Sequence, residues 1–281
     1  MPKTIIHTPS IDNITLEMIS SVIPGSVSRS NNFYLITHKN VLSHEELDEL
    51  RKNISLDVNT VPDTFDPSQI ALLITDMDST LISIECVDEI ADFLSIKDKV
   101  SEITESAMRG EIDFNTSLKK RVSLLKGLDY DVLNRVYLER LTLNPGAEQL
   151  ISGLQKRGVK TALVSGGFTF FTERLKDRLK LDFTLSNTLE VVDNKLTGSV
   201  IGDVVNGAVK AAYLQKLADD MNIDVKQAIA VGDGANDLPM LGLSGLGIAY
   251  RAKPVVQQQA DVVFNYSGLD AVLDFLNLEN D

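Results

Sequence analysis

Three short apolar runs lie at residues 70–74, 161–164 and 228–231, and each ends abruptly in small or acidic residues. Continuous apolar runs of this length, separated by segments of helical periodicity, are typical of a parallel sheet that is buried on both faces. The helical patterns lie at 146–157, 168–180 and 208–221. We therefore predict an α/β domain built on a doubly wound parallel sheet.

A helical insert is predicted between the first apolar run and the segment that starts at Pro145. Val87, Ile90, Ala91 and Leu94 follow helical spacing, and similar series occur within 118–125 and 132–141. The insert at about 86–143 is therefore expected to be a cap of three or four helices next to the end of the first core strand. Further along, Leu185 to Val200 contains two extended segments around Asp193-Asn194, which predicts a β-hairpin.

The first 67 residues predict a small α+β domain. A short amphipathic helix is expected around Ile14 to Val22 and a strand at 33–37. A capping box at Ser43 to Glu46 opens a second helix. The stretch 61–67, which contains two prolines, is then predicted to be a linker. The boundary falls near residue 68, so the second domain is 68–281.

The composition narrows the class of protein. The 281 residues are 43% hydrophobic and 24% charged, which is typical of a globular chain. No run of 18 apolar residues and no signal-peptide pattern is present, so a soluble cytoplasmic protein is expected, with no membrane partner. A net charge of −13 without a basic patch argues against nucleic-acid binding.

Histidine and cysteine usage excludes several kinds of chemistry. The three histidines are His7, His38 and His44, all within the first 44 residues. Any chemistry in the 237 residues that follow therefore proceeds without a His base, a Ser-His-Asp triad or a His-bound metal. The single cysteine, Cys86, excludes an intramolecular disulfide. Because no cationic helper is evident beside it, we interpret Cys86 as a packing residue rather than a nucleophile.

Polar residues follow each of the three predicted strands. They are Asp76 and Asp78, then Ser165 with Gly166 and Gly167, then Asp233, Gly234, Asn236 and Asp237. In an open α/β sheet, ligands bind beyond the carboxyl ends of the strands, so these groups are expected to converge. Clustered carboxylates ionise together only at a cost, and a hard cation such as Mg²⁺ relieves it. The alternative is that Asp233 and Asn236 only form a turn.

Two more candidate groups follow from the same expectation of an anionic ligand. Ser165-Gly166-Gly167, predicted to open the next helix, would offer a hydroxyl and backbone amides to an anion. Lys210 could neutralise phosphate charge, or it could be a solvated lysine on a helix face.

Arg121 lies on the apolar side of its predicted helix, three residues after Leu118 and four before Leu125. A buried guanidinium is costly unless a carboxylate accepts its hydrogen bonds. That carboxylate belongs either to a substrate or to a cap residue such as Glu105 or Glu111.

The loop Asp76-Met77-Asp78-Ser79-Thr80 and its downstream partners resemble the haloacid-dehalogenase-type phosphatases. The family pattern is a DxDx[TV] loop, a Ser or Thr after the second strand, a Lys, and a GDGxND-like loop, and all four occur here in order. The resemblance covers about residues 70–275. It implies that Asp76 attacks phosphorus and that Asp78 protonates the leaving group and then activates water. It also implies a Mg²⁺ site made by Asp76, Asp78 (through its main-chain carbonyl) and Asp233.

Within that superfamily, the blocks around Glu85, Phe114 to Leu125, Ser165 and Asp233 are similar to the phosphoserine phosphatase family. The resemblance implies Mg²⁺-dependent hydrolysis of O-phospho-L-serine to L-serine and phosphate, the last step of serine biosynthesis. Glu85 would bind the substrate ammonium and Arg121 its carboxylate. The set around the phosphate would be Ser165, Gly166, Lys210 and Asn236, and the residues that help to close the cap would be Met108, Gly110 and Phe114.

Other interpretations stay open at this point. The same chemistry could act on another small phosphomonoester or transfer the phosphoryl group to homoserine. A signalling receiver module and a non-catalytic binding protein are two further alternatives. Family members often carry an ACT-like amino-acid-binding module at the N-terminus, but the pattern in residues 1–67 does not predict the βαββαβ order of such a module. Pairing of two subunits in a homodimer is then the alternative role for this segment.

Overall fold

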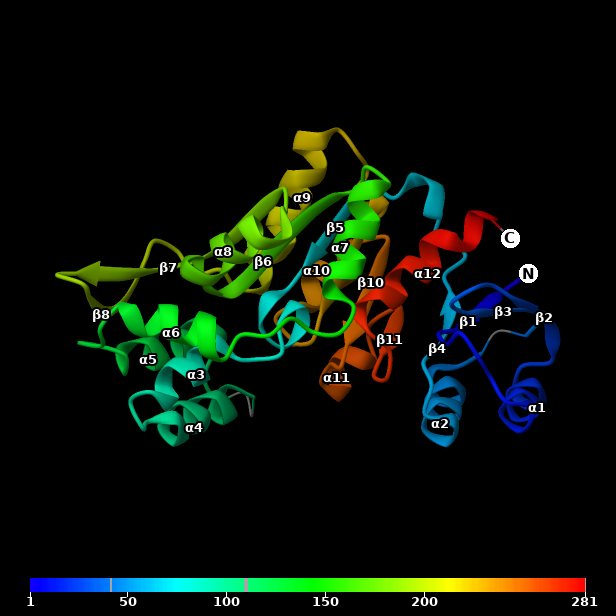
Figure 1. Cartoon of the computed structure of the whole chain (residues 1–281), viewed down its shortest axis with the longest axis horizontal. Coiled ribbons are helices and arrows are strands. Elements are labelled where there is room, and N and C mark those ends of the chain that lie inside the picture. The colour runs from blue at the N-terminus through cyan, green and yellow to red at the C-terminus, as the bar shows by residue number, and fades with distance from the viewer. Residues whose placement is uncertain (41, 109–110, 281) are drawn as a thin grey trace.

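The computed structural model describes residues 1–40, 42–108 and 111–280. Figure 1 shows three regions along the long axis of the molecule: the N-terminal domain at one end, a helical cap at the other, and the main sheet between them. Among the described residues, none of the helices is both long enough and apolar enough to cross a membrane.

The main sheet has the order β11-β10-β9-β5-β6-β7-β8 within the described ranges. All its paired strands run parallel except β8, which is antiparallel to β7. The three predicted strands are therefore confirmed as β5, β9 and β6, with β5 in the centre between the other two. The strands are β5 (Leu72–Thr75), β6 (Lys160–Phe168), β7 (Phe183–Val192), β8 (Lys195–Ile201), β9 (Ala228–Gly232), β10 (Leu246–Tyr250) and β11 (Val262–Phe264).

Helices cover both faces of this sheet, as predicted for a doubly wound fold. Successive residues of β5 point to opposite faces, so Leu73 packs with the core that includes α7 and α8, while Leu72 and Ile74 pack with the core that includes α9 and α10. The covering helices are α7 (Ala147–Lys156), α8 (Thr169–Leu179), α9 (Gly207–Met221), α10 (Leu238–Leu243), α11 (Pro254–Gln257) and α12 (Val272–Leu276). Beyond β9, the strands β10 and β11 and the helices α10 to α12 were not predicted.

The cap follows β5 directly and consists of helices in its described part, as predicted. These are α3 (Cys86–Asp92), α4 (Lys97–Met108), α5 (Phe114–Ser123) and α6 (Asp131–Glu139). The predicted hairpin is confirmed as β7 and β8, and positive φ angles at Asp193 (50°) and Asn194 (59°) form its tight turn. The hairpin supports the cap, because the amide of Gly127 donates to the carbonyl of Leu196 at 2.8 Å.

The N-terminal domain has the order βαββαβ, which corrects the expectation from the sequence. Its elements are β1 (Lys3–Ile6), α1 (Asn13–Val22), β2 (Gly25–Arg29), β3 (Tyr34–His38), α2 (His44–Ile54) and β4 (Val58–Val61). They form an antiparallel sheet in the order β2-β3-β1-β4. Every residue of β2 is exposed, so this strand lacks the apolar alternation that reveals strands in a sequence.

This domain is attached to the main sheet by buried polar contacts. The Asp57 carboxylate accepts hydrogen bonds from the amides of Asn265, Tyr266 and Ser267 at 2.7–3.0 Å. Asn59 exchanges two hydrogen bonds with the backbone of Val263, at 2.9 and 3.0 Å. Strand β4, which leads into the predicted linker at 61–67, is therefore fixed against β11 and the residues that follow it.

Candidate active site

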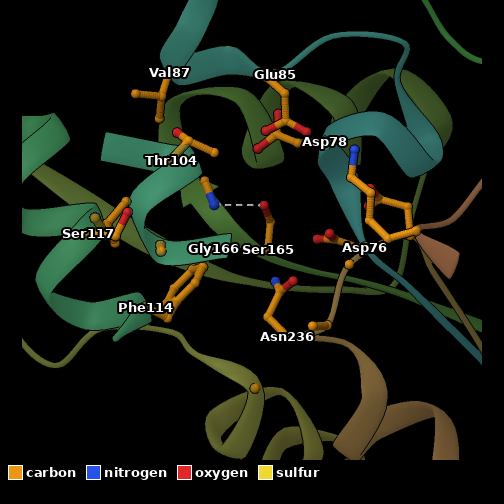
Figure 2. Close-up of a pocket in the computed structure, with 18 of the residues that line it drawn as sticks. Asp76, Asp78, Glu85, Val87, Thr104, Phe114, Ser117, Ser165, Gly166 and Asn236 are labelled. Atoms are coloured by element: carbon orange, nitrogen blue, oxygen red, sulfur yellow. Dashed lines mark hydrogen bonds between the residues drawn. The ribbon is translucent and has the colours of Figure 1, made fainter. Parts of the chain in front are cut away.

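A pocket of about 520 Å³ lies at the carboxyl ends of β5, β6 and β9, between the sheet and the cap. Figure 2 shows its two walls: Asp76, Ser165 and Asn236 come from the core, while Phe114 and Ser117 come from cap helix α5. This is the edge of the sheet at which the sequence predicts convergence of polar groups.

The loop after β5 is held in a constrained conformation. The amide of Asp76 donates to the carbonyl of Val231 at 2.9 Å, which joins β5 to β9 at the pocket floor. Ser79 has φ +56°, in the left-handed region that non-glycine residues rarely adopt. The side-chain amide of Asn144 donates to the carbonyls of Thr80 and Ile82 at 2.8 and 3.0 Å and holds this turn. Asp76 and Asp78 therefore project from a rigid support.

Lys210 forms the centre of a buried charge cluster. Its Nζ lies 2.7 Å from Oδ1 of Asp76 and 2.7 Å from Oδ1 of Asp237, and the Lys210 side chain is 0% exposed. Burial alone would lower the pKa of Lys210, but Asp237 and Asp76 outweigh this effect and raise it. Lys210 is a cation of the site, and the alternative of a solvated lysine is wrong.

Three carboxylates form a group suited to a divalent cation. One oxygen from each of Asp76, Asp233 and Asp237 lies within 4.8 Å of the others. Burial raises the pKa of Asp76 to about 7 and that of Asp233 to about 8, and the neighbouring carboxylates add to both shifts. Such mutual destabilisation of negative charge is what a hard, oxygen-seeking cation relieves, so the residues fit a divalent metal.

The sequence-based metal set of Asp76, Asp78 and Asp233 shares two members with this group. The third member, Asp78, was predicted to bind the metal through its main-chain carbonyl, and its carboxylate accepts a hydrogen bond from the amide of Cys86 at 3.1 Å. Burial, Glu85 and Asp76 raise the pKa of Asp78, which favours its protonated form. The sequence analysis noted Asp237 in the acidic loop but did not place it in the metal set. Its ion pair with Lys210 is a contact between distant segments, which the sequence pattern does not specify.

Ser165, Gly166 and Gly167 form the last part of β6 and do not open the following helix, which begins only at Thr169. This corrects the predicted anion site at a helix N-terminus. The Ser165 hydroxyl accepts a hydrogen bond from the amide of Gly167 at 2.8 Å. A Cβ at Gly167 would lie 2.8 Å from Oδ2 of Asp78, so a larger residue at this position would displace the Asp78 carboxylate.

The cap wall carries the predicted pair Glu85 and Arg121. The hydroxyl of Ser79 donates to Oε1 of Glu85 at 2.6 Å, and burial raises the pKa of Glu85. Burial lowers the pKa of Arg121, while Glu85, Asp88 and Asp78 act against that shift. The Nε atom of Arg121 is buried and has no hydrogen-bond partner. Arg121 therefore faces the pocket with a free donor.

Some of the other pocket residues were predicted from the sequence and some were not. Asn236 and Phe114 line the pocket as expected, and the Phe114 ring approaches Gly166 so closely that a Cβ there would lie 2.7 Å from Cζ. Gly110 and the side chain of Met108 lie outside the described part of the chain. Ser117, Thr104 and Lys253 also line the pocket but were not proposed from the sequence. Their helical or loop positions alone carry no signal, apart from the spacing of Ser117 four residues before Arg121.

Cys86 is buried next to this site. Burial and the carboxylate of Asp78 raise its pKa well above the ordinary value for a thiol. A protonated thiol is a poor nucleophile, which agrees with the packing role assigned from the sequence.

Comparison with known proteins places this geometry in a family. Residues 70–245 match the model for haloacid dehalogenase-like hydrolases. A HAD family hydrolase from Salmonella enterica serovar Typhi has 37% sequence identity and a TM-score of 0.90, and the match covers 99% of both chains. The chain therefore belongs to the haloacid dehalogenase-like hydrolases.

Several relatives of the chain are phosphoserine phosphatases. The chain is 50% identical to phosphoserine phosphatase of Polaromonas over 224 residues, which cover 78% of this chain and 95% of the relative. It is 52% identical to phosphoserine phosphatase of Haemophilus influenzae over 210 residues, which cover 75% of this chain and 67% of the relative. The protein is accordingly a phosphatase, as the sequence resemblance implied.

Proposed function

We propose that the protein hydrolyses O-phospho-L-serine to L-serine and phosphate with Mg²⁺. The observation that carries this proposal is that one pocket is lined by Asp76 and Asp233 on the core and by Glu85 and Arg121 on the cap, with the buried Lys210 in contact with Asp76. A phosphate group and an amino-acid group are the two ends of phosphoserine. The cap wall offers a negative group to the ammonium and a positive group to the carboxylate, and the core wall would accept the phosphate through Lys210 and a divalent cation held by its carboxylates. The names of the relatives support the same substrate.

In the proposed reaction, a carboxylate oxygen of Asp76 attacks phosphorus, and the bond from phosphorus to the serine oxygen breaks. Asp78 gives its proton to the leaving serine oxygen. Water then attacks the phosphorus of the phosphoaspartyl group, Asp78 takes up the water proton, and phosphate leaves Asp76. The raised pKa of Asp78 supports its role as the proton carrier.

Mg²⁺ would be held by Asp76, Asp233 and the main-chain carbonyl of Asp78, with Asp237 as a further carboxylate of the group. When bound, the ion supplies positive charge that lets the anionic substrate approach the carboxylates. Lys210, Ser165, Gly166 and Asn236 would surround the phosphate. On the cap, Glu85 would bind the substrate ammonium and Arg121 the substrate carboxylate, the latter through charge-assisted hydrogen bonds.

A panel of initial rates tests this function. Phosphoserine, phosphothreonine, phosphoethanolamine and sugar phosphates are compared with Mg²⁺ present, and with and without added homoserine. We expect phosphoserine to have the highest kcat/KM and homoserine to leave the release of inorganic phosphate unchanged. A faster rate on another phosphomonoester, or phosphohomoserine as a product, would replace phosphoserine hydrolysis by the corresponding alternative. An enzyme that hydrolyses phosphoserine would catalyse the last step of serine biosynthesis.

A further inference from the structure

The hydroxyl of Ser117 is a buried polar group without a partner. Ser117 is 1% exposed, lines the pocket from α5, and its Oγ makes no hydrogen bond. A buried serine inside a helix can satisfy its hydroxyl by donating to a backbone carbonyl of the preceding turn. Two other cap hydroxyls do so: Thr104 donates to the carbonyl of Val100 at 3.1 Å and Ser123 to that of Lys120 at 2.7 Å.

An unsatisfied buried hydroxyl costs about 1–3 kcal/mol of stability. Its presence at a pocket wall indicates that a bound ligand supplies the missing hydrogen bond. The same helix carries a second such atom, the buried Nε of Arg121. Residues four apart lie on one face of a helix, so Ser117 and Arg121 present two free donors to the same part of the pocket. Figure 2 shows Ser117 with Phe114 on this cap wall, opposite Ser165 and Asn236.

We propose that Ser117 is a specificity-determining residue whose hydroxyl donates, together with Nε of Arg121, to the carboxylate of the substrate. The inference rests on the proposed function and adds a residue to its recognition of amino-acid phosphates. A carboxylate offers two acceptor oxygens, which can take one hydrogen bond from each donor.

Charge decides which end of the substrate the Ser117 hydroxyl meets. The positive guanidinium of Arg121 repels an ammonium, whereas Glu85 attracts one and lies with its Oε1 already bonded to Ser79. The phosphate belongs at the core wall, where Lys210 is fixed by Asp76 and Asp237. The remaining group of a phosphorylated amino acid is its carboxylate, and it is an acceptor for both free donors.

Ser117→Ala tests the proposal with three substrates. Phosphoserine carries a carboxylate, while phosphoethanolamine and p-nitrophenyl phosphate lack one. A hydrogen bond to a charged group is worth enough for a loss of about tenfold or more in kcat/KM. We expect that loss for phosphoserine, mainly as a raised KM, and unchanged kcat/KM for the other two substrates. An unchanged value for phosphoserine, or equal losses on all three substrates, would overturn the role of Ser117.

Thermal unfolding separates recognition from a structural role. Because the substitution removes an unsatisfied buried hydroxyl and alanine favours helices, the Tm of Ser117→Ala is expected to equal or exceed that of the wild type. A lower Tm would indicate that the hydroxyl stabilises the free protein, against the proposal. Ser123→Ala is the matched control on the same helix, because its hydroxyl is bonded within the helix and lies outside the pocket lining. It should change none of the three rates.

A double-mutant cycle tests whether the two donors act together. If both bind one carboxylate, Ser117→Ala should cost phosphoserine hydrolysis much less in an Arg121→Ala background than in the wild type. Fully additive losses would contradict a shared carboxylate. The wild-type rates keep the two proposals distinguishable. A wild type that does not hydrolyse phosphoserine overturns the proposed function, whereas an active wild type with an unaffected Ser117→Ala variant overturns only the role of Ser117.

Discussion

The two walls of the pocket satisfy their polar groups in different ways. On the core wall, Lys210 contacts Asp76 and Asp237 directly, and the Asp237 carboxylate also accepts the amide of Gly234 at 3.0 Å. On the cap wall, the Ser117 hydroxyl and Nε of Arg121 are buried without partners. The core groups are ordered before any ligand binds, while the cap donors need a ligand to be satisfied.

This difference separates chemistry from recognition. Groups that act on a reacting phosphorus must already be in place when charge develops. Contacts within the protein hold these groups, and a divalent cation would relieve the repulsion among their carboxylates. Groups that select a substrate increase specificity when a wrong ligand leaves them buried and unpaired, because that ligand then binds poorly. Changes to the core wall are therefore expected to affect every substrate, and changes to the cap wall only those with an amino-acid end.

Asp76→Asn should produce the largest effect. The substitution removes the proposed nucleophile, so hydrolysis of both phosphoserine and p-nitrophenyl phosphate should fall by on the order of 10⁴-fold or more. Initial rates measure this loss, and a circular dichroism spectrum like that of the wild type shows that the fold persists. Asp177→Asn, on the exposed side of α8, is the control and should retain full activity. Substantial turnover by Asp76→Asn would exclude the nucleophilic role.

Removal of divalent metal should stop both reactions reversibly. Without a cation the carboxylates of Asp76, Asp233 and Asp237 repel each other and an incoming phosphate. The measurement is the rate after dialysis against a chelator and again after Mg²⁺ is restored. Activity that survives chelation would contradict the metal assignment, and recovery with Mg²⁺ but not with Ca²⁺ would favour the smaller ion.

Arg121→Ala should show the selectivity of the cap wall. Loss of a guanidinium that pairs with a carboxylate is expected to lower kcat/KM for phosphoserine about 100-fold, with little change for p-nitrophenyl phosphate. Lys120→Ala, on the exposed face of the same helix, is the charge-matched control. Equal losses on both substrates would indicate that Arg121 is a structural residue and that the two walls do not differ as described.

The titration of the site carboxylates should affect stability rather than substrate selectivity. In the folded protein without metal, Asp76 and Asp233 have pKa values of about 7 and about 8, whereas carboxyl groups of an unfolded chain titrate near pH 4. Between these limits the folded state binds more protons, so the free energy of unfolding falls as the pH rises.

The expected change is a decrease on the order of ten degrees in the Tm of the metal-free protein between about pH 5 and pH 9. Thermal unfolding in chelator measures it, and Asp233→Asn should reduce the slope because one titrating carboxyl is gone. Added Mg²⁺ should restore more stability at pH 9 than at pH 5. A Tm that rises with pH in chelator would show that the carboxylates do not destabilise one another.

Much of the core wall could be predicted from the sequence, because its residues follow local patterns. The apolar runs that became β5, β6 and β9 end at Asp76, Ser165 and Asp233, and parallel strands bring those ends to one edge. The helical spacing around Arg121 also predicted its pocket-facing side. The N-terminal domain was harder, because the exposed strand β2 has no alternation, and the Gly-containing end of β6 was mistaken for the start of a helix.

The sequence by itself determined the three core strands that form the site, the cap after the first of them and the acidic groups at the strand ends, because each follows from spacing along a short stretch of chain. Only the tertiary structure decided that Lys210 is enclosed by Asp76 and Asp237, that Asp57 and Asn59 fix the front domain to the last strand, and that Ser117 is buried without a partner. The first two features join residues that are far apart in the chain, and the third depends on the absence of a hydrogen-bond partner for Ser117. Local periodicity carries no information about either.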